Sequence, residues 1–146
     1  MRVLEQLRLP IVQGPMAGGA CTSALIAGVA QGGGLGSMAG SLLSPEKIRA
    51  QAAEIRALTD RPFLINLFVQ DTPQPSTEQV DAACAWLRPV LDRLGTDSLP
   101  MPAKWCEDFG AQLDALVEVR PAVASFTFDI LKRAQVERLH AASIEV

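Results

Sequence analysis

Short runs of apolar residues alternate along this chain with longer stretches in which apolar residues recur every three or four positions. The short runs occupy residues 11–13, 35–38, 63–69 and 122–126, and a further run begins at residue 143. The run 63–69 is apolar at six of its seven positions. A strand that is apolar on both faces is typical of a parallel sheet covered by helices, so these runs predict parallel strands.

The stretches between the strands carry the start and stop signals of helices. Thr22 can cap a first helix, which must stop at the glycines of residues 32–34. A second helix is predicted to start after Ser44, because a capping hydroxyl there precedes a proline and an acid. Its buried face is expected to comprise Ile48, Ala52 and Ile55.

Three more helices are predicted in the second half of the chain. Residues 76–79 fit a capping box, and in the helix that follows we expect a kink or an early end at Pro89. Trp105 and Phe109 begin another run at helical spacing, and both are expected in the core. A last helix is predicted over residues 130–142.

Strands that alternate with helices in this way predict repeated βαβ units and a parallel sheet. Two α/β architectures share that pattern, an open doubly wound sheet and a TIM barrel. The glycines of residues 34–40 do not fit the dinucleotide-binding pattern G-x-G-x-x-G, and the sequence contains no Walker phosphate loop. These absences favour a partial TIM (β/α)₈ barrel with roughly the first four βα units, although composition alone does not decide.

The composition is that of a globular chain. Of its 146 residues, 49% are hydrophobic and 20% are charged, and the formal net charge of −3 is too weak to favour nucleic acid or an anionic membrane. No apolar run approaches the roughly 18 residues of a membrane span, and the N-terminus lacks a secretory signal. The cysteines Cys21, Cys84 and Cys106 lack metal-ligand spacing, so we expect reduced thiols, no metal and a cytoplasmic protein.

Several stretches resemble one known family. Residues 10–19 read PIVQGPMAGG, residues 33–36 read GGLG, and LTDRPF at 58–63 leads into NLFV at 66–69. Together with SFTF at residues 125–128, they occur in an order and spacing that resemble the nitronate monooxygenase family, once called 2-nitropropane dioxygenases. The resemblance covers essentially the whole chain.

This resemblance implies a TIM-barrel flavoprotein that binds FMN without a covalent link. Such an oxidoreductase would oxidise alkyl nitronates with dioxygen to carbonyl compounds and nitrite, with a small-molecule nitronate as its partner and neither nucleic acid nor membrane. The main chain of Gly14, Pro15, Met16 and Ala17 would lie against the flavin ring, and Asn66 would hydrogen-bond the cofactor. Both places follow strands, and a barrel places its site at the C-terminal ends of its strands.

Each of these residues also has a plain structural interpretation. A buried amide at a strand end must find a partner, and Asn66 could bond a neighbouring loop instead of a flavin. Residues 14–17 could be a simple tight turn, and the glycines of residues 32–36 favour a helix stop and close packing over a phosphate cradle. His140, the only histidine, and Cys21 are expected to be structural.

A complete barrel of this type takes about 250 residues. The chain is therefore expected to be the N-terminal part of one FMN-binding barrel domain, residues 1–146, without its C-terminal half. The family's histidine motif, held to carry the catalytic base, would lie beyond residue 146, so no catalytic residue is predicted. By itself the chain should be inactive, bind FMN weakly or not at all, leave the apolar residues of 63–69 uncovered, and either form a homo-oligomer or aggregate.

Two other functions stay open. The flavin-dependent enoyl-ACP reductase branch of the same superfamily shares the GGLG and TDRPF neighbourhoods, whereas NLFV at residues 66–69 favours the monooxygenase. From a different class, the chain could be a non-catalytic half-barrel that associates with itself. Neither the substrate nor the oligomeric state can be deduced from the sequence.

Overall fold

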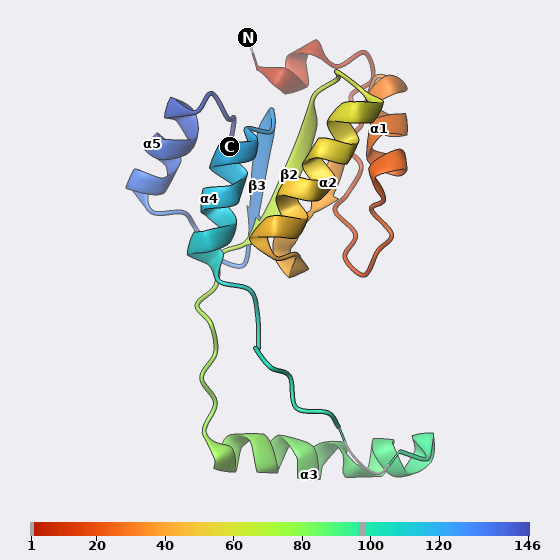
Figure 1. The fold of residues 1–146 in the computed structure, drawn as a ribbon, viewed down its shortest axis with the longest axis vertical. Helices are drawn as coiled ribbons and strands as arrows, with labels where there is room; N and C mark the ends of the chain where they lie inside the picture. Colours follow the sequence, from red (N-terminus) through yellow and green to blue (C-terminus); the bar gives the residue numbers. More distant parts are fainter. Residues whose placement is uncertain (1, 97–98) are drawn as a thin grey trace. The chain divides into compact units, whose positions relative to one another are not determined.

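The computed structural model describes residues 2–96 and 99–146. Its sheet has three parallel strands in the order β1-β2-β3, which span Gly36–Ala39, Phe63–Phe68 and Val123–Thr127 (Figure 1). Isolated parallel bridges add Val12, which pairs with Leu35, and Glu145, which pairs with Val123. The five segments predicted as strands therefore pair in parallel, and the α/β prediction is confirmed.

The chain divides into two compact units. The first comprises Met1–Asp71 and Glu107–Val146 and contains the whole sheet. The second, Thr72–Cys106, contains the helix α3, Thr77–Leu94.

Three helices of the first unit cover one face of the sheet (Figure 1). They are α1 (Ser23–Gln31), α2 (Pro45–Leu58) and α4 (Phe109–Val119). Side chains alternate between the two faces of a strand, and every second residue of β2 packs under these helices. These residues are Phe63, Ile65 and Leu67. The helix-covered face therefore carries the main hydrophobic core.

The first two helices start where the sequence predicts. Thr22 Oγ1 accepts a hydrogen bond from Leu25 N at 3.1 Å, and Ser44 Oγ accepts one from Lys47 N at 3.4 Å. The predicted buried face of α2 is confirmed, because all three of its residues are at most 1% exposed. They are Ile48, Ala52 and Ile55.

The opposite face of the sheet, here called the inner face, is closed at the N-terminal end of the strands. Leu35, Leu64 and Val123 form a buried apolar cluster there. Val3 and Leu7, in and beside a short 3₁₀ helix over Val3–Gln6, pack against it. This cluster is called the closed end. The expectation that the apolar residues of 63–69 lie uncovered is wrong for four of them, Phe63, Leu64, Ile65 and Leu67, which are buried, whereas Phe68 and Val69 are half-buried.

The helix α3 starts as predicted but does not end early. Its capping box is confirmed, because Ser76 Oγ accepts from Gln79 N at 3.3 Å while the Gln79 side chain accepts from Ser76 N at 2.8 Å. The helix continues past Pro89 to its end at Leu94. Pro89 and Ala85, whose carbonyl loses its helical donor, are both exposed, so water can replace the lost bond.

Two predicted boundaries are wrong. Trp105 lies outside α4, which begins at Phe109 because Asp108 Oδ1 accepts from Ala111 N at 2.7 Å. Trp105 is 46% exposed and is not part of the core, whereas Phe109 packs against it.

The last helix, α5, spans Arg133–Ala141 instead of residues 130–142. Phe128 has a positive φ of 80°, and Asp129 Oδ1 accepts from Ile130 N at 2.7 Å. These turn features keep residues 128–130 out of helical geometry, so the helix begins only after Lys132.

Candidate functional site

Polar side chains gather on the inner face at the carboxyl ends of β2 and β3. Asn66 is 5% exposed, and its Nδ2 donates to Ser125 Oγ at 2.9 Å, to the Ser125 carbonyl at 3.2 Å and to Thr127 Oγ1 at 3.2 Å. Asn66 is the register partner of Ser125, and Thr127 follows two residues later on the same face. These three residues are called the polar end. The partners of the Asn66 amide thus come from the adjacent strand and not from a loop.

These contacts fix the orientation of the Asn66 amide. A main-chain carbonyl can only accept, so the group that faces the Ser125 carbonyl has to be the NH₂ of the amide. The Asn66 carbonyl oxygen, Oδ1, therefore faces away from β3. The side chain is held so that it presents an acceptor to whatever lies on its other side.

The loop after the first strand is exposed, as a site for a ligand has to be. Gly14, Pro15, Met16 and Ala17 all lie at the surface. Two of their main-chain groups already have protein partners, because the Gly14 carbonyl accepts from Gln13 Nε2 and Met16 N donates to Cys21 Sγ at 3.0 Å. Other main-chain groups of this exposed loop face solvent or a ligand.

The glycines that this turn needs lie slightly later than predicted. Gly18 and Gly19 have φ values of 80° and 95°, which only glycine adopts readily. Gly14 has no positive φ, and a Cβ built on it meets nothing within 4 Å. The loop therefore makes its unusual turn at residues 18–19.

The structure places the two predicted parts of the site at the same edge of the sheet. The Gly14 loop follows the segment that pairs with the sheet at Val12, and Asn66 lies on β2. β1 lies between them. Ala39 at the end of β1 is the register partner of Asn66. Loop and amide are therefore separated by one strand, and a planar ligand that contacts both has to lie across the end of β1.

The residues present fit the ring of a flavin in their chemistry. The polar edge of that ring carries carbonyl acceptors and an N–H donor, so it requires both kinds of partner. The Asn66 carbonyl offers an acceptor, the hydroxyls of Ser125 and Thr127 can donate, and the exposed loop offers main-chain groups.

The glycines after α1 serve packing, as predicted. A Cβ on Gly34 would lie 2.9 Å from the Ile11 carbonyl, and one on Gly36 would collide with the main chain of Ile26. Helix α1 can approach β1 this closely only where side chains are absent. These glycines bring strand and helix together.

Ser37 is a polar residue that the sequence does not single out. It is 0% exposed, and its Oγ has no hydrogen-bond partner among the described residues. Its register partner Leu64 belongs to the closed end. Ser37 lies in the run 35–38 that is predicted as a strand, but no sequence signal marks its hydroxyl as buried.

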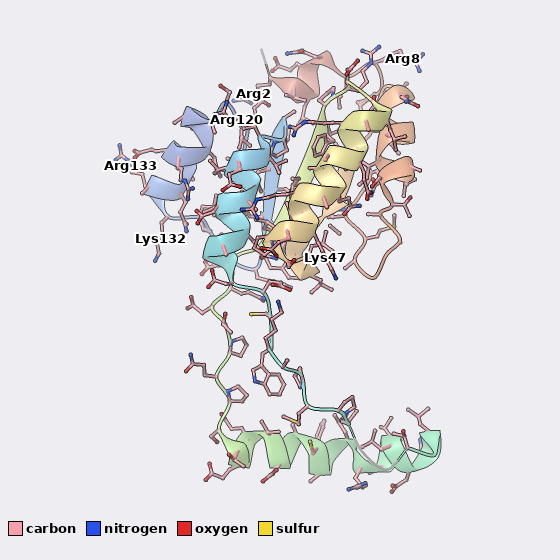
Figure 2. The ribbon with its side chains drawn as sticks, in the orientation of Figure 1. Arg2, Arg8, Lys47, Arg120, Lys132 and Arg133 are labelled. Atoms are coloured by element: carbon pink, nitrogen blue, oxygen red, sulfur yellow. The ribbon has the colours of Figure 1, made fainter. Side chains whose placement is uncertain are left out.

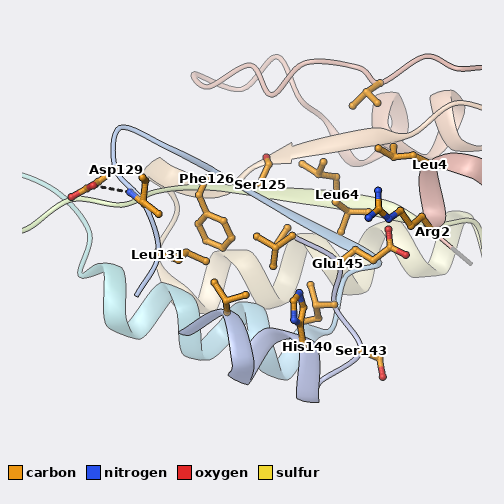
Figure 3. Close-up of a pocket in the computed structure, with 17 residues that line it drawn as sticks. Arg2, Leu4, Leu64, Ser125, Phe126, Asp129, Leu131, His140, Ser143 and Glu145 are labelled. Atoms are coloured by element: carbon orange, nitrogen blue, oxygen red, sulfur yellow. Dashed lines mark hydrogen bonds between the residues drawn. The ribbon is translucent and has the colours of Figure 1, made fainter. Parts of the chain in front are cut away.

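A hollow of about 1100 Å³ lies between β3, α5 and the N-terminal segment (Figure 3). Ser125, Phe126 and His140 are among the residues that line it. Its two carboxylates have structural partners, since Asp129 holds Ile130 N and the Glu145 oxygens accept from Val3 N at 2.8 and 3.0 Å. Both carboxylates of the hollow therefore accept hydrogen bonds from main-chain amides of this chain.

The remaining candidates are His140 and the three cysteines. His140 is exposed in the last turn of α5, and Cys21 is a buried free thiol while Cys84 and Cys106 are half-buried free thiols. Within residues 2–96 and 99–146, no cluster of His, Cys, Asp or Glu could hold a metal ion. No helix in these ranges is long and apolar enough to cross a membrane.

Basic side chains of the first unit come from separate elements (Figure 2). Arg2 precedes the N-terminal 3₁₀ helix, Lys47 lies in α2, and Arg120 ends α4 with a φ of 52°. Lys132 and Arg133 lie at the start of α5. None of these labelled residues belongs to the polar end or to the Gly14 loop.

The chain matches the nitronate monooxygenase family over residues 2–146. It is 39% identical over 145 residues to the nitronate monooxygenase of Pseudomonas aeruginosa, which covers 96% of this chain and 40% of that protein. It is 33% identical over 138 residues to a probable nitronate monooxygenase of Bacillus subtilis, and this match covers 93% of this chain and 39% of that protein. The chain thus spans about 40% of the length of these relatives.

Solved structures agree on the fold. The crystal structure of a nitroalkane oxidase from Streptomyces ansochromogenes superposes with a TM-score of 0.81 at 32% identity, over 97% of this chain and 40% of that one. The fold is thus that of the N-terminal part of a TIM barrel, as predicted. A FabK variant from Thermotoga maritima, 21% identical with a TM-score of 0.63, covers 97% of this chain and 35% of its own. At that identity the likeness shows the fold alone.

Proposed function

The chain belongs to the nitronate monooxygenase family, and we propose that residues 1–146 supply the first part of an FMN site that oxidises alkyl nitronates. The products would be a carbonyl compound and nitrite, with dioxygen as the oxidant. The observation that carries this proposal is the orientation of Asn66, whose NH₂ is held by β3 so that Oδ1 is presented as an acceptor. The likeness to FabK adds no second activity, because it concerns the fold alone.

Bound FMN would supply the redox chemistry, accepting electrons from the nitronate and passing them to dioxygen. The chain's own residues bind and orient. Asn66 Oδ1 would accept from an N–H of the ring, and the hydroxyls of Ser125 and Thr127 hold its NH₂ so that this acceptor cannot turn away. The main chain of Gly14–Ala17 would contact the ring from the other side of β1.

The apolar closed end buries the same face of the sheet at the N-terminal ends of the strands. We propose no catalytic base within this chain, since neither the polar end nor the loop of residues 14–17 contains a histidine or a carboxylate. The Pseudomonas aeruginosa relative is longer, and the match covers 40% of it. We propose that the base and the remaining FMN contacts come from residues equivalent to the unmatched part of that relative.

Flavin binding can be tested by titrating FMN with the 146-residue chain and with Asn66→Ala, following flavin fluorescence. We expect weak, saturable quenching that Asn66→Ala weakens about tenfold to hundredfold, because a lost hydrogen-bond partner costs about 1–3 kcal/mol. Gln31→Met is the matched control, since Gln31 bonds only the Leu58 carbonyl, at 2.8 Å, far along the chain from the site.

Activity can be tested in a chimera in which this chain replaces the matching part of the Pseudomonas aeruginosa relative. The chimera should purify with FMN and release nitrite from propionate 3-nitronate, and Asn66→Ala in the same background should lose flavin. A folded chimera that retains no FMN, or one that retains FMN equally well with alanine at position 66, would contradict the proposal.

A further inference from the structure

The side chain of Gln13 lies where the first strand leaves the sheet, and it replaces a main-chain hydrogen bond. Leu35 N donates to the Ile11 carbonyl at 2.9 Å, and Gln13 N donates to the Leu35 carbonyl at 2.9 Å. In a regular parallel ladder, the next donor, Ser37 N, would bond the Gln13 carbonyl. It bonds Gln13 Oε1 instead, at 3.0 Å. The side chain therefore closes the last rung of the ladder, and the main chain leaves the sheet at this residue.

The other end of the same carboxamide holds the loop that follows. Gln13 Nε2 donates to the Gly14 carbonyl and to Cys21 Sγ, the latter at 3.2 Å. Cys21 Sγ also accepts from Met16 N at 3.0 Å. The NH₂ of Gln13 has two hydrogens, and these two acceptors use both of them. The loop is therefore tied at Gly14 to Gln13 and at Met16 to Cys21.

Cys21 is itself fixed by the body of the first unit. It is 7% exposed, and Gln51 Nε2 of α2 donates to its main-chain carbonyl at 2.7 Å. Gly14 offers no steric reason for the path of the loop, because its φ is not positive and the space around it is open. The path between the sheet and Met16 is therefore set by the bonds of the Gln13 carboxamide and the Cys21 sulfur.

We propose that Gln13 is a positioning residue for the cofactor: it directs the main chain of Gly14–Ala17 to the place where the flavin ring lies. This inference rests on the proposed function for the identity of the ligand. The three hydrogen bonds of the Gln13 side chain are all to protein atoms. Its effect on binding passes through the loop.

The first measurement is the rate at which iodoacetamide alkylates Cys21, in the chain with Cys84→Ser and Cys106→Ser so that one thiol remains. Gln13→Met removes both ends of the carboxamide at nearly constant volume and should speed alkylation about tenfold, because the loop over the sulfur opens more often. Gln31→Met is the matched control, since it also removes a side-chain bond to a carbonyl, and it should leave the rate unchanged.

A second variant covers the case in which Gln13→Met fails to fold. Gln13→Glu keeps an oxygen for Ser37 N but loses the donor to Gly14 and Cys21, so it should retain the thermal midpoint and still speed alkylation. Alkylation at the original rate in the folded variants would overturn the proposal.

The second measurement is the FMN fluorescence titration of the same proteins. A dissociation constant raised about tenfold in Gln13→Glu, at an unchanged thermal midpoint, would support the positioning role, because a purely structural residue would move the midpoint and not the affinity. Faster alkylation with unchanged FMN affinity would overturn it. If the unsubstituted chain does not bind FMN, the affinities are compared in the Pseudomonas aeruginosa chimera, where failure to retain FMN contradicts the proposed function, while the alkylation rates decide separately whether Gln13 directs the loop.

Discussion

The two ends of the inner face are built from the same strands and differ in chemistry. At the closed end, Leu35, Leu64 and Val123 are buried under the N-terminal segment. Two residues further along β2 and β3, at the polar end, the same face carries Asn66 and Ser125, which bond to each other. Since successive residues on one face of a strand differ by two positions, this change occurs within a single step.

The difference shows how one sheet can separate stability from function. In barrels of this type, the C-terminal ends of the strands carry the site and the N-terminal ends carry stability. Here the closed end is a cluster of buried apolar side chains, whereas the polar end holds a buried amide by three contacts and leaves its carbonyl oxygen for another partner. Substitutions at the two ends should therefore have separable effects.

The largest expected effect is a loss of stability at the closed end. Leu35 is 0% exposed, so Leu35→Ala leaves a cavity and should lower the free energy of unfolding by about 2–5 kcal/mol. Urea denaturation followed by circular dichroism would measure it. Leu42→Ala is the matched control, because Leu42 is 59% exposed and should change stability little.

The same variant tests the separation itself. While Leu35→Ala remains folded, its FMN affinity should stay within about twofold of the unsubstituted chain, because the closed end does not contact the proposed site. A loss of affinity as large as that of Asn66→Ala would mean that the two ends act as one unit.

Most of the helices and all of the strands could be predicted from the sequence, because their signals are local. The hydroxyls of Thr22 and Ser44 cap the helices that follow them, and the apolar run 63–69 contains β2. The prediction was wrong for Trp105. Its spacing to Phe109 is helical, but Asp108 caps the helix, so the helix begins at Phe109 and excludes Trp105. A side chain that caps a helix competes locally with continuation of the helix, and the spacing of apolar residues does not reveal it.

The candidate site was predictable only in part. Asn66 stands out as the one polar residue of an apolar strand, but the orientation of its amide depends on Ser125, which lies 59 positions away. Gln13 gives no signal, because its role depends on Ser37 N and Cys21 Sγ meeting one side chain. Contacts between residues so far apart in sequence arise from the fold and leave no pattern in a single sequence.

A smaller effect is expected at Ser44, which follows β1 at the same edge of the sheet as the polar end but acts only as a cap. Ser44→Ala should lower the free energy of unfolding by about 1 kcal/mol and leave FMN affinity unchanged. Ser44→Asp, which can also cap, should restore the stability. If the alanine variant loses FMN affinity at unchanged stability, Ser44 belongs to the site and the polar end is larger than its three residues.

The smallest effect is expected from the helix layer, outside both ends of the inner face. Arg49 Nε of α2 donates to Glu118 Oε2 of α4 at 2.6 Å, and this hydrogen bond is the main cause that lowers the pKa of Glu118 below its ordinary value. A carboxyl with a lowered folded-state pKa binds fewer protons folded than unfolded. Its contribution is therefore complete above the ordinary value of about 4.3 and is lost as the pH falls through the lower folded-state value.

This pH dependence of stability can be tested with Glu118→Gln. The side chains of Arg49 and Glu118 are 40% and 59% exposed, so solvent screens the pair and the gain is small. The thermal midpoint of the unsubstituted chain should exceed that of the variant slightly at pH 7 and at low salt, and the gap should close in acid or in about 1 M NaCl. FMN affinity at pH 7 should be equal in the two proteins. A gap that widens as the pH falls would show that Glu118 is stabilised in its protonated form, and an affinity change would show that the helix layer reaches the polar end through β2.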